Sequence, residues 1–107
     1  MIVLTRYRVE TGGEQAFQAE VASAMVALTE RPGFLDADLG QNADDPTLWT
    51  LTLRWRDVGS YRRALSAYDV KVSSVPLLSR ALDEPSAYVV VAQWRTGDGG
   101  GGSLSPS

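Results

Sequence analysis

The sequence predicts one α+β domain in which two helical segments cover one face of a four-stranded antiparallel sheet. Two observations lead to this prediction. β-Rich runs of strand length and stretches of helical periodicity follow one another in the order β-α-β-β-α-β. Each half of that order is a βαβ-like unit, and right-handed crossovers put both helical segments on the same face of the sheet. The expected fold is therefore ferredoxin-like, and 107 residues leave room for one such domain.

The first half of the chain is expected to form a strand, a helix and a second strand. Residues 2–9 are the first β-rich run, and residues 34–39 alternate well enough to be the second strand. Between them, residues 14–30 place apolar side chains on one helical face: Phe17, Val21, Met25 and Leu28. The step Arg31-Pro32-Gly33 ends that helix, because proline removes an amide donor and glycine frees the backbone.

The second half begins with a hairpin. Residues 41–46 are dense in turn-forming residues, and residues 48–56 form the clearest strand of the chain. One face of this strand carries four large apolar side chains: Trp49, Leu51, Leu53 and Trp55. We expect this face to meet the helices.

Two helical segments and a last strand are expected to follow. Asp57 is a suitable N-cap for a helix, and the inner stripe of that helix is Val58, Tyr61, Leu65 and Tyr68. Residues 70–82 are again helical, and Pro76 either divides them into two short helices or occupies a first turn. Residues 86–94 form the fourth strand, and its continuous apolar middle predicts cover on both faces.

Composition excludes several classes of function. The net charge is −3 and no basic stretch is present, which argues against nucleic-acid binding. No run approaches the roughly 20 apolar residues that span a bilayer, and no signal peptide is evident, so we expect a cytoplasmic protein. The sequence has no cysteine and no histidine. Thiolate chemistry, imidazole metal sites and Ser-His-Asp triads are therefore excluded, and we expect no metal site.

Two regions differ in composition. Residues 1–95 contain all the predicted elements and form the folded domain. Residues 96–107 are rich in glycine and serine, cannot bury apolar area, and are expected to be a disordered tail.

The sheet face turned away from the helices is expected to be charged. It carries four arginines and two aspartates: Arg6, Arg8, Arg54, Arg56, Asp36 and Asp38. Three interpretations are open: a solvated face, a polar interface between subunits, or an anion-binding patch. The charge pattern alone favours the solvated face.

Several motifs together indicate a family. They are Arg31-Pro32-Gly33-Phe34-Leu35 after the first helix, Asp45-Pro46 in the hairpin, and Trp55 at a strand end with Tyr61 in the next helix. With them, residues 1–94 resemble the antibiotic biosynthesis monooxygenase (ABM) family of dimeric α/β barrels. The resemblance implies a homodimer whose two sheets pack face to face, which raises the interface interpretation of the charged face. It also implies a pocket for a small aromatic molecule between each sheet and its own helices.

The resemblance also suggests site residues. Trp55 and Tyr61 match a pocket tryptophan and tyrosine of hydroxylase-type members, and we expect them to be catalytic. Substrate contacts are expected from five further residues: Thr5, Tyr7, Leu51, Leu53 and Tyr68. The haem-ligating histidine of haem-degrading members would fall near Ser73, so haem degradation is not expected. A proton acceptor is harder to identify, because Tyr7, Tyr61 and Tyr68, as tyrosines of ordinary pKa near ~10, are poor bases and Asp69 is the remaining candidate.

Two functions follow from these residues. The first is a cofactor-independent monooxygenase that acts on a small aromatic, polyketide-like substrate. The alternative is a non-catalytic homodimer that binds a small ligand or is purely structural, in which Trp55 and Tyr61 are core aromatics. An enclosed void beside Trp55 and Tyr61, with a polar group within hydrogen-bond reach, distinguishes the oxygenase from the alternative.

Overall fold

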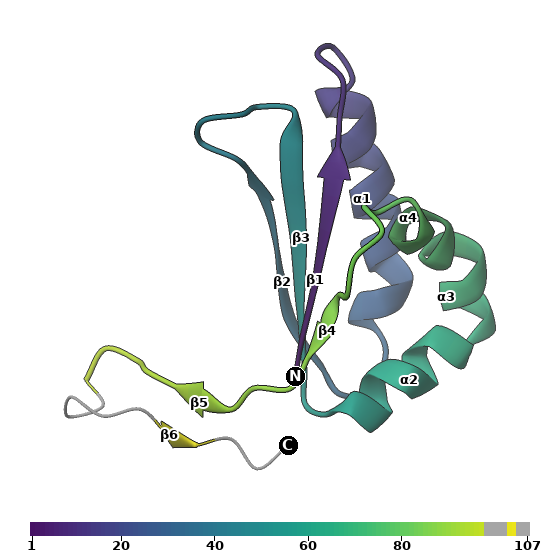
Figure 1. Cartoon of the computed structure of the whole chain (residues 1–107). Helices are drawn as coiled ribbons and strands as arrows, with labels where there is room; N and C mark the ends of the chain where they lie inside the picture. Colours follow the sequence, from purple (N-terminus) through teal and green to yellow (C-terminus); the bar gives the residue numbers. More distant parts are fainter. Residues whose placement is uncertain (98–102, 105–107) are drawn as a thin grey trace.

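The computed structural model describes residues 1–97 and 103–104 (Figure 1). The elements are β1 (Ile2–Arg8), α1 (Glu14–Thr29), β2 (Phe34–Gln41), β3 (Leu48–Trp55), α2 (Val58–Ser66), α3 (Tyr68–Ser73), α4 (Val75–Ser79), β4 (Ala87–Tyr88), β5 (Ala92–Gln93) and β6 (Ser103–Leu104). The main sheet has the strand order β2-β3-β1-β4, and every pairing in it is antiparallel. All four helices lie on one side of this sheet (Figure 1). This arrangement confirms the predicted ferredoxin-like α+β fold.

The alternation of β1 and β3 decides which residues form the core. In their antiparallel register Val3 lies opposite Leu53, Thr5 opposite Leu51, and Tyr7 opposite Trp49. Successive side chains of a strand point to opposite faces, so these six residues share one face, and all six are buried beneath the helices. The inner face predicted for β3 is therefore confirmed.

Helix α1 packs on this face as its periodicity predicts. Phe17, Val21 and Leu28 are buried, and Met25 is half-buried against the same core. Two alanines, Ala24 and Ala27, let neighbouring elements approach closely. Ser74, at the junction of α3 and α4, is fully buried and donates a hydrogen bond from its Oγ to the carbonyl of Ala24, at 2.6 Å. This bond fixes the later helices against α1.

The region after β3 is broken into three short helices. Asp57 caps α2, because its Oδ1 accepts a hydrogen bond from the amide of Ser60 at 2.7 Å. The helix stops at Ser66, since Ala67 has an extended backbone (φ −71°, ψ 138°) and α3 starts afresh at Tyr68. Pro76 lies in the first turn of α4 and also separates that helix from α3, as predicted.

The prediction of one covered strand over residues 86–94 was wrong. The strand β4 is limited to Ala87 and Tyr88, which pair with Val3 and Ile2 of β1, and the carbonyl of Ser86 accepts one further bond from the amide of Leu4. Among the described residues, those that follow Tyr88 run past the start of β1 and form no strand pairing with it. The chain then leaves the sheet as an arm that carries β5 (Figure 1), and Val91 and Trp94 on it are 71% and 70% exposed.

The predicted Gly/Ser-rich tail falls largely outside the described residues. Residues 98–102 and 105–107 are not described, so disorder of residues 96–107 stays a prediction. Ser103–Leu104 form β6, which pairs with β5 in a separate two-stranded sheet. Within residues 1–97 and 103–104, no helix has the length and apolar character needed to cross a bilayer.

The charges on the open face of the sheet are paired within the chain. Arg54 bridges Asp36 and Asp38 at 2.6 and 2.9 Å, and Arg8 contacts Asp45 at 2.7 Å. The other two arginines also have acidic neighbours: Arg6 contacts Glu84, and Arg56 contacts Asp57. Such pairing leaves little net positive charge for an anion, so it disfavours the anion-binding interpretation.

The turn at Gly33 yields a stability prediction. Gly33 has φ +88°, and a Cβ built there would lie 2.3 Å from the Oγ of Ser60. We expect Gly33→Ala to combine backbone strain of about 1–2 kcal/mol with an overpacking cost of about 1–3 kcal/mol. Gly12→Ala is the matched control, because Gly12 has φ +96° and open space around it, so only the strain applies. Urea unfolding measures both, and equal losses for the two variants would refute the proposed clash.

Candidate functional site

A cavity of about 500 Å³ lies between β1 and the helices α2, α3 and α4. We call it the ligand cavity. Its apolar wall is made by Leu65, Val75 and Leu78. Its polar groups are the hydroxyls of Thr5, Tyr61, Ser79 and Ser86 and the ammonium of Lys71. Because Lys71 and Ser79 are exposed, the cavity reaches the molecular surface, and a small molecule can enter it.

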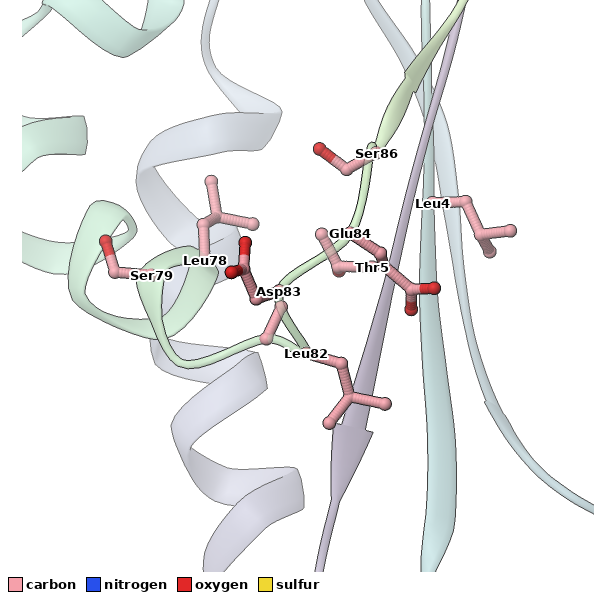
Figure 2. A pocket seen from close by; sticks show the side chains of 9 residues that line it. Leu4, Thr5, Leu78, Ser79, Leu82, Asp83, Glu84 and Ser86 are labelled. Atoms are coloured by element: carbon pink, nitrogen blue, oxygen red, sulfur yellow. The ribbon is translucent and has the colours of Figure 1, made fainter.

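A second cavity of about 290 Å³ adjoins the first between α4, β1 and the segment that leads into β4 (Figure 2). It shares Thr5, Leu78, Ser79 and Ser86 with the ligand cavity and adds two carboxylates, Asp83 and Glu84. We call it the acid lobe. The two cavities therefore adjoin each other around Thr5.

Thr5 joins a short chain of polar groups on the floor of the site. Its Oγ1 lies 3.2 Å from the hydroxyl of Tyr7 and 3.3 Å from the carbonyl of Leu51. A threonine hydroxyl has one proton, so when Thr5 donates it to Leu51, the Tyr7 hydroxyl donates to Thr5. Burial has the largest effect on the phenol of Tyr7 and raises its pKa. Tyr7 is therefore protonated at neutral pH and acts as a donor.

Tyr61 places the second phenol of the site at the cavity wall. Helix α2 presents it over Trp55, with ring centroids 5.7 Å apart, and Trp55 packs on its other side against Phe34 at 5.3 Å. Burial raises the pKa of Tyr61 above its ordinary value. No described residue makes a hydrogen bond with its hydroxyl, so this hydroxyl can donate to a ligand.

The structure separates the residues predicted for the site into three groups. Thr5 and Tyr61 line the ligand cavity. Four others lie beneath it in the core: Tyr7, Leu51, Leu53 and Trp55. Of these, Tyr7 reaches the site through Thr5, whereas Trp55 is 0% exposed and its indole Nε1 has no hydrogen-bond partner among the described residues. Trp55 therefore supports Tyr61 from behind and does not line the ligand cavity.

Tyr68 is the third case, because it lies apart from the ligand cavity. It is 84% exposed and lies with Asp69 along an outer groove between α1 and α3. The cause is the break at Ala67, which ends the periodicity of α2 before Tyr68 can continue its inner stripe. Asp69, considered above as a base, is outside the cavity for the same reason.

Sequence reasoning missed most of the helical wall. Lys71, Val75, Leu78 and Ser79 come from α3 and α4, and Asp83 from the segment after them. The one available signal was Lys71, the only lysine of the chain. No described group of three or more His, Cys, Asp or Glu side chains is arranged to hold a metal ion.

Comparison with known proteins agrees with this geometry. The sequence profile of the family described as antibiotic biosynthesis monooxygenase matches residues 1–72. The chain belongs to the ABM family. The match covers β1, α1, β2, β3, α2 and most of α3, so it includes Thr5, Tyr61 and Lys71 of the ligand cavity. A comparison with functionally curated proteins gives no match.

Several solved structures share the fold. SnoaB, a cofactor-independent oxygenase from Streptomyces nogalater, is 21% identical over 76% of this chain and 82% of its own, with a TM-score of 0.64. A conserved protein from Methanosarcina mazei Go1 is 24% identical over 80% and 84%, with a TM-score of 0.63. A structure described as an antibiotic biosynthesis monooxygenase is 15% identical over 81% and 92%, with a TM-score of 0.59.

The two buried phenols predict how stability changes at alkaline pH. Below the ordinary tyrosine pKa of about 10, both phenols are protonated in the folded and unfolded chains, and their contribution is complete. As pH rises above that value, the unfolded chain releases these protons first, so the free energy of unfolding falls until the raised folded pKa values are passed. Urea unfolding between pH 8 and 11 measures the fall. A Tyr7→Phe/Tyr61→Phe double variant should lose less stability over this range, and an unchanged slope would contradict the assignment.

The hydrogen bonds of Thr5 predict that substitutions of Thr5 and Tyr7 lower the free energy of unfolding by different amounts. Thr5→Val leaves the buried Tyr7 hydroxyl without its partner, which should lower the free energy of unfolding by about 1–3 kcal/mol. Tyr7→Phe should affect this bond network less, because Thr5 can still donate to Leu51. A double-mutant cycle on Thr5 and Tyr7, measured by denaturant unfolding, separates the energy of the hydrogen bond between the two hydroxyls from the other effects of each substitution. A coupling energy of zero would rule out the bond.

Proposed function

We propose that this ABM protein is a cofactor-independent monooxygenase acting on a small, flat, polyketide-like aromatic substrate. The observation that carries the proposal is the ligand cavity itself. Its apolar wall of Leu65, Val75 and Leu78 faces the hydroxyls of Thr5 and Tyr61 across a volume of about 500 Å³. A planar aromatic of a few fused rings fits this combination of an apolar slot and a small number of polar contacts.

The chemistry needs a substrate that supplies the electrons. In an anthrone, removal of a proton from the ring CH₂ leaves an electron-rich carbanion whose charge is shared with the carbonyl oxygen as an enolate. Dioxygen oxidises this carbon: the CH₂ becomes C=O, and the second oxygen atom leaves as water with the two hydrogens. Tyr61 donates a hydrogen bond to the enolate oxygen, and the apolar wall keeps water away from the carbanion.

Family membership supports the proposal, and the description of SnoaB as a cofactor-independent oxygenase adds to it. The second candidate, a non-catalytic small-ligand-binding or structural protein, is favoured by one observation. The space beside Trp55 is filled by Phe34 and Tyr61, so no aromatic substrate stacks on the indole. The ligand cavity is lined by Tyr61 and not by Trp55. A substrate can therefore bind beside Tyr61 without stacking on the indole, and for this reason we prefer the oxygenase.

Oxygen consumption tests the oxygenase proposal. With anthrone as the substrate, the purified protein should increase dioxygen uptake above the buffer rate and yield anthraquinone. Tyr61→Phe should reduce kcat by about 100–1,000-fold, because it removes one donor to the developing enolate. Tyr68→Phe is the matched control and should keep the wild-type rate, since Tyr68 lies outside the cavity. Uptake by the wild type no faster than in buffer would leave the non-catalytic candidate in its place.

We also propose that the protein is a homodimer, as the family resemblance implies. The open sheet face has its charges compensated within the chain, so it can approach a second face without stranding a charge. The arm adjoins that face, because Val90, Ala92 and Gln93 line a cavity with Ile2, Asp36 and Arg54. Exposed Val91 and Trp94 on the arm supply apolar area for a second copy to cover.

Sedimentation tests the dimer. The wild type should sediment as a dimer at about 10 µM, and Val91→Asp should shift it toward the monomer because a charge would be buried in the interface. Val72→Asp is the matched control, since Val72 is equally apolar and 60% exposed but lies on α3 at the helical side. Dissociation by Val72→Asp and not by Val91→Asp would move the interface to the helices.

A further inference from the structure

The acid lobe holds two neighbouring carboxylates with different surroundings. Glu84 accepts two bonds from Arg6, from Nε to Oε1 at 2.6 Å and from Nη2 to Oε2 at 3.0 Å. The Arg6 hydrogen bonds lower the pKa of Glu84, so this carboxylate is held as an anion by a fixed partner. Such a group is a poor acceptor for another proton.

Asp83 has no such partner. Within the described part of the chain it makes no ion pair, and its carboxylate accepts no hydrogen bond. Figure 2 shows this carboxylate directed into the space between α4 and the segment that carries Ser86, whereas Glu84 turns to the other side of β1. Of the two described carboxylates that line these adjoining cavities, Asp83 is the one without an ion-pair partner.

The phenols of the site cannot replace it. Tyr61 lines the cavity, and Tyr7 reaches it through Thr5, but burial raises the pKa of both, so both hold their protons at neutral pH. They can donate hydrogen bonds and cannot accept the proton that an oxygenase must first remove. Aspartate serves as the general base in enzymes that remove a proton beside a carbonyl group.

We infer that Asp83 is the general base of this site, an inference that rests on the proposed oxygenase function. A substrate in the ligand cavity extends past Thr5 into the acid lobe and presents its acidic C–H to Asp83. The proton passes to a carboxylate oxygen, which becomes a neutral carboxylic acid, and the C–H electron pair stays on the substrate as the enolate. Because Asp83 is exposed, it can return the proton to water before the next turnover.

The proton transfer can be measured without oxygenation. Under argon in D₂O, the protein should accelerate exchange of the anthrone CH₂ hydrogens for deuterium, followed by proton NMR. Asp83→Asn should lose this acceleration by about 100-fold or more, in line with the usual contribution of a general base. Asp83→Glu, which keeps a carboxylate, should retain most of it. Asp44→Asn is the matched control, because Asp44 lies exposed in the turn between β2 and β3.

Two further measurements distinguish a catalytic role of Asp83 from a purely structural one. The thermal midpoint of Asp83→Asn should equal that of the wild type, since no described bond is lost, and anthrone binding by fluorescence quenching should change less than about threefold. Wild-type exchange in Asp83→Asn, with oxygen uptake intact, would overturn the role of Asp83 and leave the oxygenase standing. A wild type that accelerates neither exchange nor uptake would overturn both.

Discussion

In the ladder between β1 and β3, Thr5 lies opposite Leu51, and this register decides what faces the helices. If β1 slipped by one residue against β3, Thr5 and Tyr7 would turn to the open face. Because β1 is flanked by β3 and β4, Thr5 occupies a central strand directly below the broken helical segment. The sheet thus supplies a rigid floor with one hydroxyl at its centre, and the helices supply the wall.

Some elements could be predicted from sequence, because burial on one face repeats every second residue in a strand and every third to fourth residue in a helix. This holds for β3 and for α1, and the cap at Asp57 has an equally local cause. Residues 86–94 were misread for a physical reason. A run of valines shows that a segment needs apolar cover, but the length of a strand depends on how much partner strand lies beside it. Here β1 offers partners to Ala87 and Tyr88.

The site was predictable only in part. The spacing of two residues along the chain indicates that they lie close together, but it does not tell which of them faces the cavity and which faces the core. Trp55 and Tyr61 are in contact, as their six-residue separation suggested, yet the indole fills the core and the phenol lines the cavity. Tyr68 shows the opposite error, since one extended residue at Ala67 was enough to remove it from the inner stripe. The rings of Trp55 and Tyr61 form a tilted aromatic contact, and such a pair is worth about 0.5–1.5 kcal/mol, so Trp55 also holds Tyr61 in place for a ligand.

Several ion-paired carboxylates of this fold lie at the open face of the sheet, whereas Asp83, which has no described ion-pair partner, lies beside the cavity. This difference matters for catalysis. On the open face each arginine has an acidic neighbour, so protonating one of those carboxylates breaks an ion pair and weakens folding. A general base must change its protonation state in every turnover without disturbing the structure that positions it. Asp83 has no described partner to lose, and it lies beside the cavity on a segment fixed by the backbone bond from Leu82 to Arg6. The same absence of a partner that makes Asp83 unimportant for stability leaves its carboxylate available for a proton.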